Sequence, residues 1–142
     1  MKYLSIDPGL TTGVAWFDDD FGFESREIAG RYDLYDFVAP LVALCPKLTV
    51  IIERWDVRKD TFGKSAQEDA RYIIGYIDGI CQATGVPYVE QRPAEAKSFA
   101  SNAKLKKLGW FQGGEGHADD ASRHLLVYLA KHRHPYVIDR LV

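Results

Sequence analysis

Three carboxylates and a histidine stand at separated points of this chain where they could bind a divalent cation. Asp7 ends the apolar run YLSID, and Glu53 ends the apolar run LTVIIE. In the segment GEGHADDA, His117 and Asp120 are three residues apart, so on a helix both side chains project from one face. Oxygen-rich ligand sets favour hard cations, and the pattern therefore predicts a magnesium or manganese site rather than a zinc site.

Each of these acids also has a plain structural explanation. Asp7 could cap the turn PGLTTG that follows it, and Glu53 could pair with a neighbouring arginine. Asp119 or Asp120 could place favourable charge at the positive end of a helix dipole. Asp119 is therefore kept as an additional candidate ligand beside the other acids.

Carboxylates in such a set suit one type of hydrolysis. Two magnesium ions about 4 Å apart, bridged by one carboxylate, can activate a water and stabilise the leaving oxygen of a phosphodiester. This chemistry needs no nucleophilic side chain, and the sequence has no GxSxG elbow, no motif pairing Cys with His and no GxxxxGK[ST] phosphate loop. The residues favour metal-dependent phosphodiester hydrolysis.

The hydrophobic pattern predicts the elements that must position these residues. The predicted strands cover residues 3–7, 13–17, 23–30, 48–53 and 85–91. The predicted helices cover residues 32–44, 65–83 and 93–101 and a last helix that starts near His117. The order βββαβαβαα predicts a single three-layer α/β domain over residues 1–142, with a mixed sheet. If the strands ending in Asp7 and Glu53 are adjacent, the two carboxylates meet at one end of the sheet.

Charge is distributed unevenly along the chain. The net charge is −2, but residues 1–36 carry eight acidic and three basic side chains, whereas residues 91–107 carry five basic ones and one acid. A Lys-rich stretch is most often a solvated helix face. Beside a phosphodiester site it predicts contact with the phosphates of a nucleic acid.

Other features of the sequence limit the class of protein to which it can belong. Cys45 and Cys81 lie in apolar helical patterns with no CxxC motif, and we expect both to fill the core without binding zinc. No apolar run approaches the ~20 residues of a membrane span, and no signal-type segment opens the chain. We therefore expect a cytoplasmic protein without a membrane partner.

Four motifs make the sequence resemble the RuvC-type Holliday junction resolvases of the RNase H-like superfamily, and most closely their short phage-borne branch. The motifs are SIDPGLTTGVAWF, VIIERW, RPAEAKSFASNAKLKKLGW and GHADDASRHLLVYLA, in the family's order across nearly the whole chain. The resemblance implies an RNase H-like three-layer α/β fold with a five-stranded mixed sheet flanked by helices. It also implies a crossover junction endodeoxyribonuclease of DNA recombination and repair, acting on branched DNA, in the host cytoplasm if phage-encoded.

The resemblance also implies roles for the acids. Asp7 resembles the acid that bridges two Mg²⁺ or Mn²⁺ ions, Glu53 the acid that ends the fourth strand, and Asp120 the acid of the last helix. His117 matches a position that is Asp in some family members and His in others, so it is a candidate fourth ligand or proton-handling group.

Basic and aromatic residues are implied to hold DNA. Lys97 and Lys104 resemble lysines near the scissile phosphate, where Lys104 is assigned a catalytic role, and Lys106 and Lys107 are expected to hold flanking phosphates. The loop after Glu53 resembles the family's junction-entering loop, although its tryptophan could instead pack on the core. Its candidate DNA contacts are Trp55, Arg58, Lys59, Phe62 and Lys64.

A four-way junction has near-twofold symmetry, and the resemblance implies a homodimer with one site per subunit. The family's dimer contact corresponds to the helical residues Tyr72, Gly75, Tyr76 and Gly79. Alternatively, the two glycines let that helix lie close to its own sheet.

Two other functions stay open. A junction-binding protein with little or no cleavage would use the same basic segment and dimer. The motif DPGLTTG also resembles the phosphate loops of actin-like and sugar-kinase proteins, although these normally need two duplicated domains to enclose a nucleotide. The resolvase interpretation includes no nucleotide cofactor.

Overall fold

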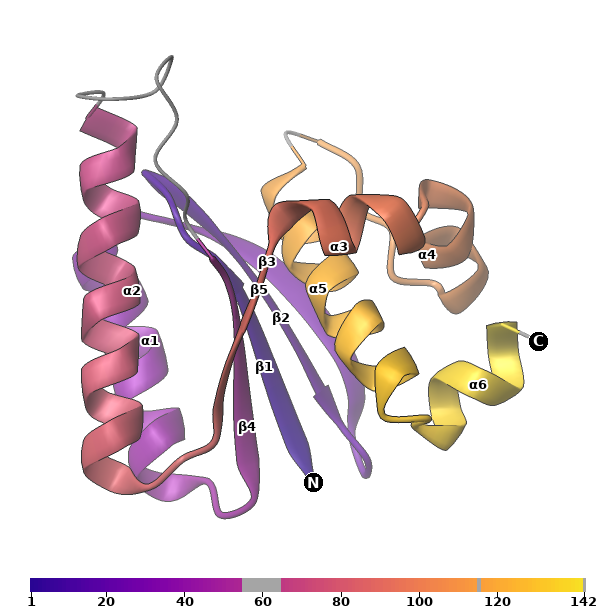
Figure 1. Cartoon of the computed structure of the whole chain (residues 1–142), viewed down its shortest axis with the longest axis horizontal. Helices are drawn as coiled ribbons and strands as arrows, with labels where there is room; N and C mark the ends of the chain where they lie inside the picture. Colours follow the sequence, from indigo (N-terminus) through magenta and orange to yellow (C-terminus); the bar gives the residue numbers. More distant parts are fainter. Residues whose placement is uncertain (55–64, 115, 142) are drawn as a thin grey trace.

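The computed structural model describes residues 1–54, 65–114 and 116–141, which form one sheet with helices on both faces (Figure 1). The strands are β1 (Lys2–Asp7), β2 (Thr11–Asp18), β3 (Gly22–Ala29), β4 (Leu48–Glu53) and β5 (Tyr88–Gln91). The helices are α1 (Arg31–Leu44), α2 (Ser65–Thr84), α3 (Pro93–Phe99), α4 (Asn102–Leu108), α5 (His117–Lys131) and α6 (Pro135–Leu141).

The sheet has the order β3-β2-β1-β4-β5. β1 pairs antiparallel with β2 and parallel with β4, and β4 pairs parallel with β5. The predicted five-stranded mixed sheet flanked by helices is therefore confirmed.

Alternation along β1 sends side chains into two separate cores. Leu4 and Ile6 are buried in a core completed by α1 and α2. Tyr3, on the other face, packs against a core completed by α5 with α3, α4 and α6. Because successive side chains of a strand point to opposite faces, Asp7 projects on the same side as Tyr3, toward the α5 layer.

A glycine near the start of β2 allows α5 to lie directly against that strand. Gly13 is buried and pairs in register with Asp7. A Cβ added to Gly13 would collide with the backbone carbonyl of His117. The absence of a side chain at Gly13 therefore lets the start of α5 lie against β2, beside Asp7 at the end of β1.

Two short helices were not predicted from the sequence. The sequence predicted one short helix over residues 93–101, but α3 ends at Phe99 and α4 begins after Ser101. The Ser101 side chain accepts a hydrogen bond from the backbone N–H of Lys104 at 3.2 Å and so caps α4. α6 begins at Pro135. The predicted order βββαβαβαα was therefore wrong after β5, because two helices of seven residues each were missing from it.

The two cysteines differ in their environments. Cys81 is buried in α2, as predicted, whereas Cys45 is the half-buried C-cap of α1 and packs only at the margin of the core. The expectation that both fill the core is right for Cys81 and only partly right for Cys45, because α1 ends one residue before it. Across the ranges that the structure covers, no helix has the length and apolar character needed to cross a membrane.

Candidate active site

The register of the sheet brings Asp7 and Glu53 together. Ile6 of β1 pairs with Ile52 of β4, so the next residue of each strand lies at the same end of the sheet. Glu53 pairs in turn with Gln91 of β5. All three terminal side chains project toward α5, because each stands on the α5-facing side of its strand.

The N-terminal part of α5 completes the group with Asp120. This half-buried residue is in the first turn of the helix. Its negative charge acts on Asp7, and the charge of Glu53 acts on Asp120. The three carboxylates singled out from the sequence thus converge from β1, β4 and α5.

Crowding of the acids changes their protonation. Burial, together with the neighbouring Glu53 carboxylate, raises the pKa of Asp7 to about 9. Burial acts in the same direction on Glu53, but the hydrogen bond and charge of His124, the hydrogen bond of Asp7 and the charge of Lys97 together lower the pKa of Glu53. Burial raises the pKa of Asp120 against the opposing effect of Arg123. Asp7 therefore holds a proton that it shares with an ionised Glu53.

One lysine lies close to all three acids. The positive charge of Lys97, an exposed residue of α3, favours the ionised forms of Asp7, Glu53 and Asp120. Lys104 is held differently, since its ammonium donates to the carbonyl of Phe99 at 2.9 Å and lies 3.7 Å from the centre of that ring. Of the two lysines expected near a scissile phosphate, Lys97 is the one beside the carboxylates.

The other two lysines of α4 lie on its surface. Both Lys106 and Lys107 are exposed in the last turn, and the Lys106 ammonium lies 4.9 Å from the centre of the Phe111 ring. Together with Lys97 and Lys104 they place four cations on two consecutive short helices, of which Lys97 acts on the acids.

His117 and Asp119 flank the site in different ways. The charge of His117 acts on Asp120, and its backbone N–H donates to Glu27 at 3.3 Å. Asp119 is buried, and its two carboxylate oxygens accept backbone N–H bonds from Gln112 and Gly113, both at 2.8 Å. These bonds hold the loop before α5, so the Asp119 carboxylate has a structural task in this arrangement.

Sequence reasoning missed His124. Its side chain is 1% exposed, its Nε2 lies 2.9 Å from Glu53 Oε2, and its Nδ1 lies 2.9 Å from Gln91 Oε1. A signal was present, because His124 follows Asp120 by four residues and so shares its helix face. The apolar residues that follow it in HLLVYL make His124 look like part of an ordinary core helix.

Arg123 is a second group near the acids that the sequence did not single out. Its Nη1 lies 4.0 Å from Asp120 Oδ1, and its Nη2 donates to Asn102 Oδ1 of α4. Arg123 therefore links the acidic end of α5 to the helix that carries most of the lysines.

The donor chemistry of the acids fits a hard divalent cation. Over the residues described, no three His, Cys, Asp or Glu side chains stand close enough to form a ready-made metal cluster. Even so, Asp7, Glu53 and Asp120 offer carboxylate oxygens at the same end of the sheet, where burial and the neighbouring Glu53 carboxylate raise the pKa of Asp7 to about 9. A cation is the natural partner for such a set, because it would remove the repulsion between the carboxylates and the need for the proton on Asp7.

Part of the expected DNA-binding surface falls outside the described ranges. Residues 55–64 include the candidates Trp55, Arg58, Lys59, Phe62 and Lys64, and these stay predictions. Arg54, the last described residue before them, is exposed, and its backbone N–H donates to Gln91 O at 2.6 Å.

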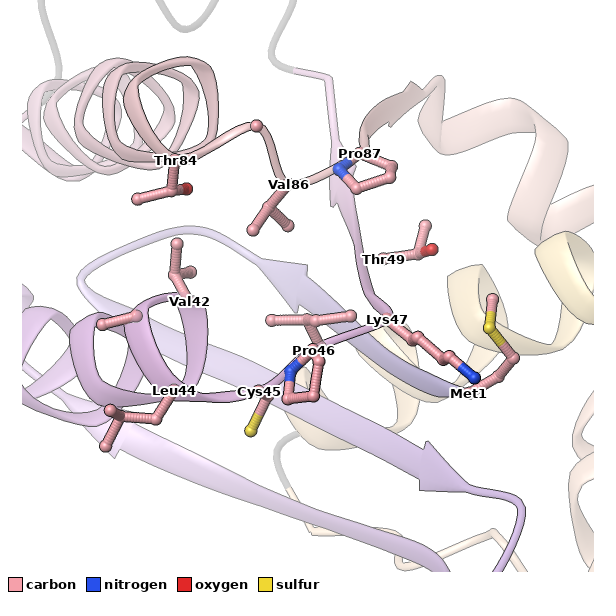
Figure 2. A pocket seen from close by; sticks show the side chains of 13 residues that line it. Met1, Val42, Leu44, Cys45, Pro46, Lys47, Thr49, Thr84, Val86 and Pro87 are labelled. Atoms are coloured by element: carbon pink, nitrogen blue, oxygen red, sulfur yellow. The ribbon is translucent and has the colours of Figure 1, made fainter.

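A hollow of about 580 Å³ lies at the opposite end of the sheet (Figure 2). Its lining includes Met1, Cys45, Thr49, Thr84 and Pro87, from the start of β1 and β4 and the ends of α1 and α2. None of its lining residues is an acid or a histidine. The chemistry at the Asp7 end therefore identifies the candidate site better than the size of a cavity does.

Two solved structures share the fold of this chain. RuvC of Thermus thermophilus in complex with a Holliday junction substrate matches with a TM-score of 0.62 and 17% identity, over 93% of this chain and 96% of that chain. A second structure of Thermus thermophilus RuvC matches with a TM-score of 0.58 and 16% identity, over 94% and 97% of the two chains. No protein-family model and no curated protein matches the sequence. The chain therefore has the RuvC-like, RNase H-like α/β fold, and its function must be argued from its own site.

Proposed function

We propose that this protein is a metal-dependent endonuclease that resolves four-way DNA junctions, and other branched DNA, by paired hydrolysis of phosphodiester bonds. The observation that carries the proposal is the convergence of Asp7, Glu53 and Asp120 at one end of the sheet, with the Lys97 ammonium beside them. Further support comes from the fold, which is that of a protein solved in complex with a Holliday junction.

In the proposed mechanism, Asp7, Glu53, Asp120 and His117 would hold two Mg²⁺ or Mn²⁺ ions. When bound, these ions supply activation of a water and stabilisation of the leaving oxygen. To act as a ligand, the Asp7 carboxylate would have to be ionised, so its proton would be released to solvent. Lys97 offsets negative charge on the phosphate that is cut.

The proposed DNA surface is local, because the chain as a whole carries a net charge of −2. Four positive charges lie on the consecutive helices α3 and α4, at Lys97, Lys104, Lys106 and Lys107, and the charge of Lys97 acts on the acids. Such lysines bind phosphates without reading sequence. The candidates in residues 55–64 would extend this surface if they contact DNA as the sequence motifs imply.

We further propose a homodimer through α2. Gly75 and Gly79 are exposed, and a Cβ added to either would meet nothing within 4 Å, so they do not serve close packing of α2 on its own sheet. Tyr72 is 52% exposed, whereas Tyr76 stacks on Tyr35 of α1 at 3.9 Å. The glycines and Tyr72 are thus better candidates for the contact than Tyr76. Membership of a phage-borne branch, and with it the host cytoplasm, stays a prediction from the motifs.

A labelled synthetic four-way junction, incubated with and without Mg²⁺ or Mn²⁺, tests the activity. We expect symmetric paired nicks only with metal, and we expect Asp7→Asn to bind the junction but not cut it. The matched control is Asp36→Asn, which changes an exposed acid on α1, on the other face of the sheet. Full cutting by Asp7→Asn would refute the metal assignment, and wild-type binding without nicking under every condition would favour the junction-binding alternative.

A salt titration of junction affinity tests the DNA surface. We expect Lys106→Ala with Lys107→Ala to weaken binding and to flatten its salt dependence by roughly one unit of slope per lost phosphate contact. Lys47→Gln, at the opposite end of the sheet, should leave the slope unchanged. An unaltered slope in the double variant would locate the DNA surface elsewhere.

A further inference from the structure

A buried histidine lies directly behind one carboxylate of the site. His124 of α5 is 1% exposed, and its Nε2 lies 2.9 Å from Glu53 Oε2. On the opposite side of the ring, Nδ1 lies 2.9 Å from the side-chain oxygen of Gln91, which is itself 3% exposed. Both ring nitrogens are therefore engaged, and a rotation of the ring would lose both contacts.

Three elements fix this arrangement. Glu53 and Gln91 are neighbours across the parallel pair β4 and β5, and the backbone N–H of Arg54 donates to Gln91 O just beyond that pair. His124 reaches both side chains from α5. Gln91 sets the ring orientation, and the ring in turn sets the position of the Glu53 carboxylate, which also shares a hydrogen bond with Asp7.

We propose that His124, oriented by Gln91, is a positioning residue for Glu53. It binds Oε2 of the carboxylate from behind and so directs the remaining oxygen lone pairs toward Asp7 and the ions that the site is proposed to hold. This inference rests on the proposed function for its consequence and on the hydrogen bonds of His124 for its geometry. Supporting groups of this type commonly contribute 10- to 100-fold to metal affinity or activity.

A purely structural explanation is that His124 only satisfies buried polar groups. Two amide variants separate this explanation from the proposal, because the amide nitrogen of Gln corresponds in reach to Nε2 of His and that of Asn to Nδ1. His124→Gln retains a donor toward Glu53, whereas His124→Asn retains only a group facing Gln91. Each variant removes one of the two hydrogen bonds from the same buried position.

The first measurement needs no catalysis. In protein labelled with ¹⁵N at histidine, we expect Glu53→Gln to shift the Nε2 resonance of His124 and to leave that of His132 unchanged. His132 is exposed, and its ring contacts Tyr128 of its own helix rather than the acids, so it is an internal control. An unchanged His124 resonance would overturn the proposal, even if every variant at position 124 failed to fold.

The second measurement compares Mn²⁺ affinity by calorimetry and single-turnover junction cutting. We expect His124→Gln to stay within about threefold of wild type and His124→Asn to lose about 10- to 100-fold in both, with junction affinity unchanged. Equal losses in the two variants, or no loss in either, would overturn the positioning role. If wild-type protein binds Mn²⁺ but cuts no junction, the proposed function fails while the Mn²⁺ comparison still tests His124.

Discussion

Replacing Asp7 with Asn should stabilise the protein in the absence of divalent cations. The pKa of Asp7 is raised from 3.8 to about 9 in the folded chain. Between these two pH values the folded state keeps the proton and the unfolded state does not, so unfolding releases it. The contribution of Asp7 to stability is therefore largest below pH 4 and falls as the pH rises toward 9. Asn has no such proton to lose, and its amide retains a donor toward Glu53.

The size of the effect follows from the pKa shift. Each pH unit inside the window costs wild type up to about 1.4 kcal/mol of unfolding free energy. Four units would set a ceiling of about 5.6 kcal/mol at pH 8. Relaxation around the buried carboxylates reduces this ceiling, so we expect about 2 kcal/mol. For a chain of this length that corresponds to roughly 6–8 °C in Tm.

Thermal unfolding in EDTA from pH 4 to pH 9 measures this difference. The Tm of Asp7→Asn should equal that of wild type near pH 4 and exceed it increasingly above that value. Asp36→Asn, which changes an exposed acid on α1, should follow the wild-type curve at every pH. A lower Tm for Asp7→Asn at pH 8, or a gap that does not depend on pH, would refute the shared-proton interpretation of the site.

Three further changes test other parts of the structure. Adding Mg²⁺ at pH 8 should raise the Tm of wild type but not that of Asp7→Asn, and equal increases in the two would count against a cation at the acids. Gly13→Ala should lower the free energy of unfolding by about 2 kcal/mol or more, because its Cβ would meet the His117 carbonyl. A denaturant melt that matched wild type would contradict this. Asp119→Asn should lower the free energy of unfolding by about 1–3 kcal/mol, because the carboxylate accepts two backbone N–H bonds. The variant should retain metal-dependent cutting at low temperature. Lost cutting with an unchanged Tm would instead indicate that Asp119 is a metal ligand.

The convergence of Asp7 and Glu53 was accessible from the sequence, because both follow apolar strands and parallel strands end at the same side of a sheet. The α5 positions were also accessible from the helical period, and Ala118, Ala121, Leu125 and Leu129 are buried on its inner face. These features depend on local periodicity and on simple topology.

Other features depend on packing, which local periodicity does not encode. The contact between His124 and Glu53 requires the depth and rotation of α5 against β4, so the same sequence pattern reads equally well as ordinary core. The difference between Lys97 and Lys104 depends on the break between α3 and α4. The Lys104 ammonium, after the break, is held on Phe99, whereas the charge of Lys97 in α3 acts on the acids. Short helices such as α4 and α6 carry too few residues for a periodic signal.

The assembly of the acids from β1, β4 and α5 has a consequence for the making of this protein. The ribosome synthesises Asp7 and Glu53 long before Asp120 and His124. The nascent chain therefore carries the acids of β1 and β4 before α5, the helix that completes the acidic site, has been made. The site forms only when α5 docks against the sheet, across contacts that are distant in sequence. Any hydrolytic capacity of this arrangement is thereby withheld until synthesis has passed α5, and premature termination before that helix yields a chain without the complete site.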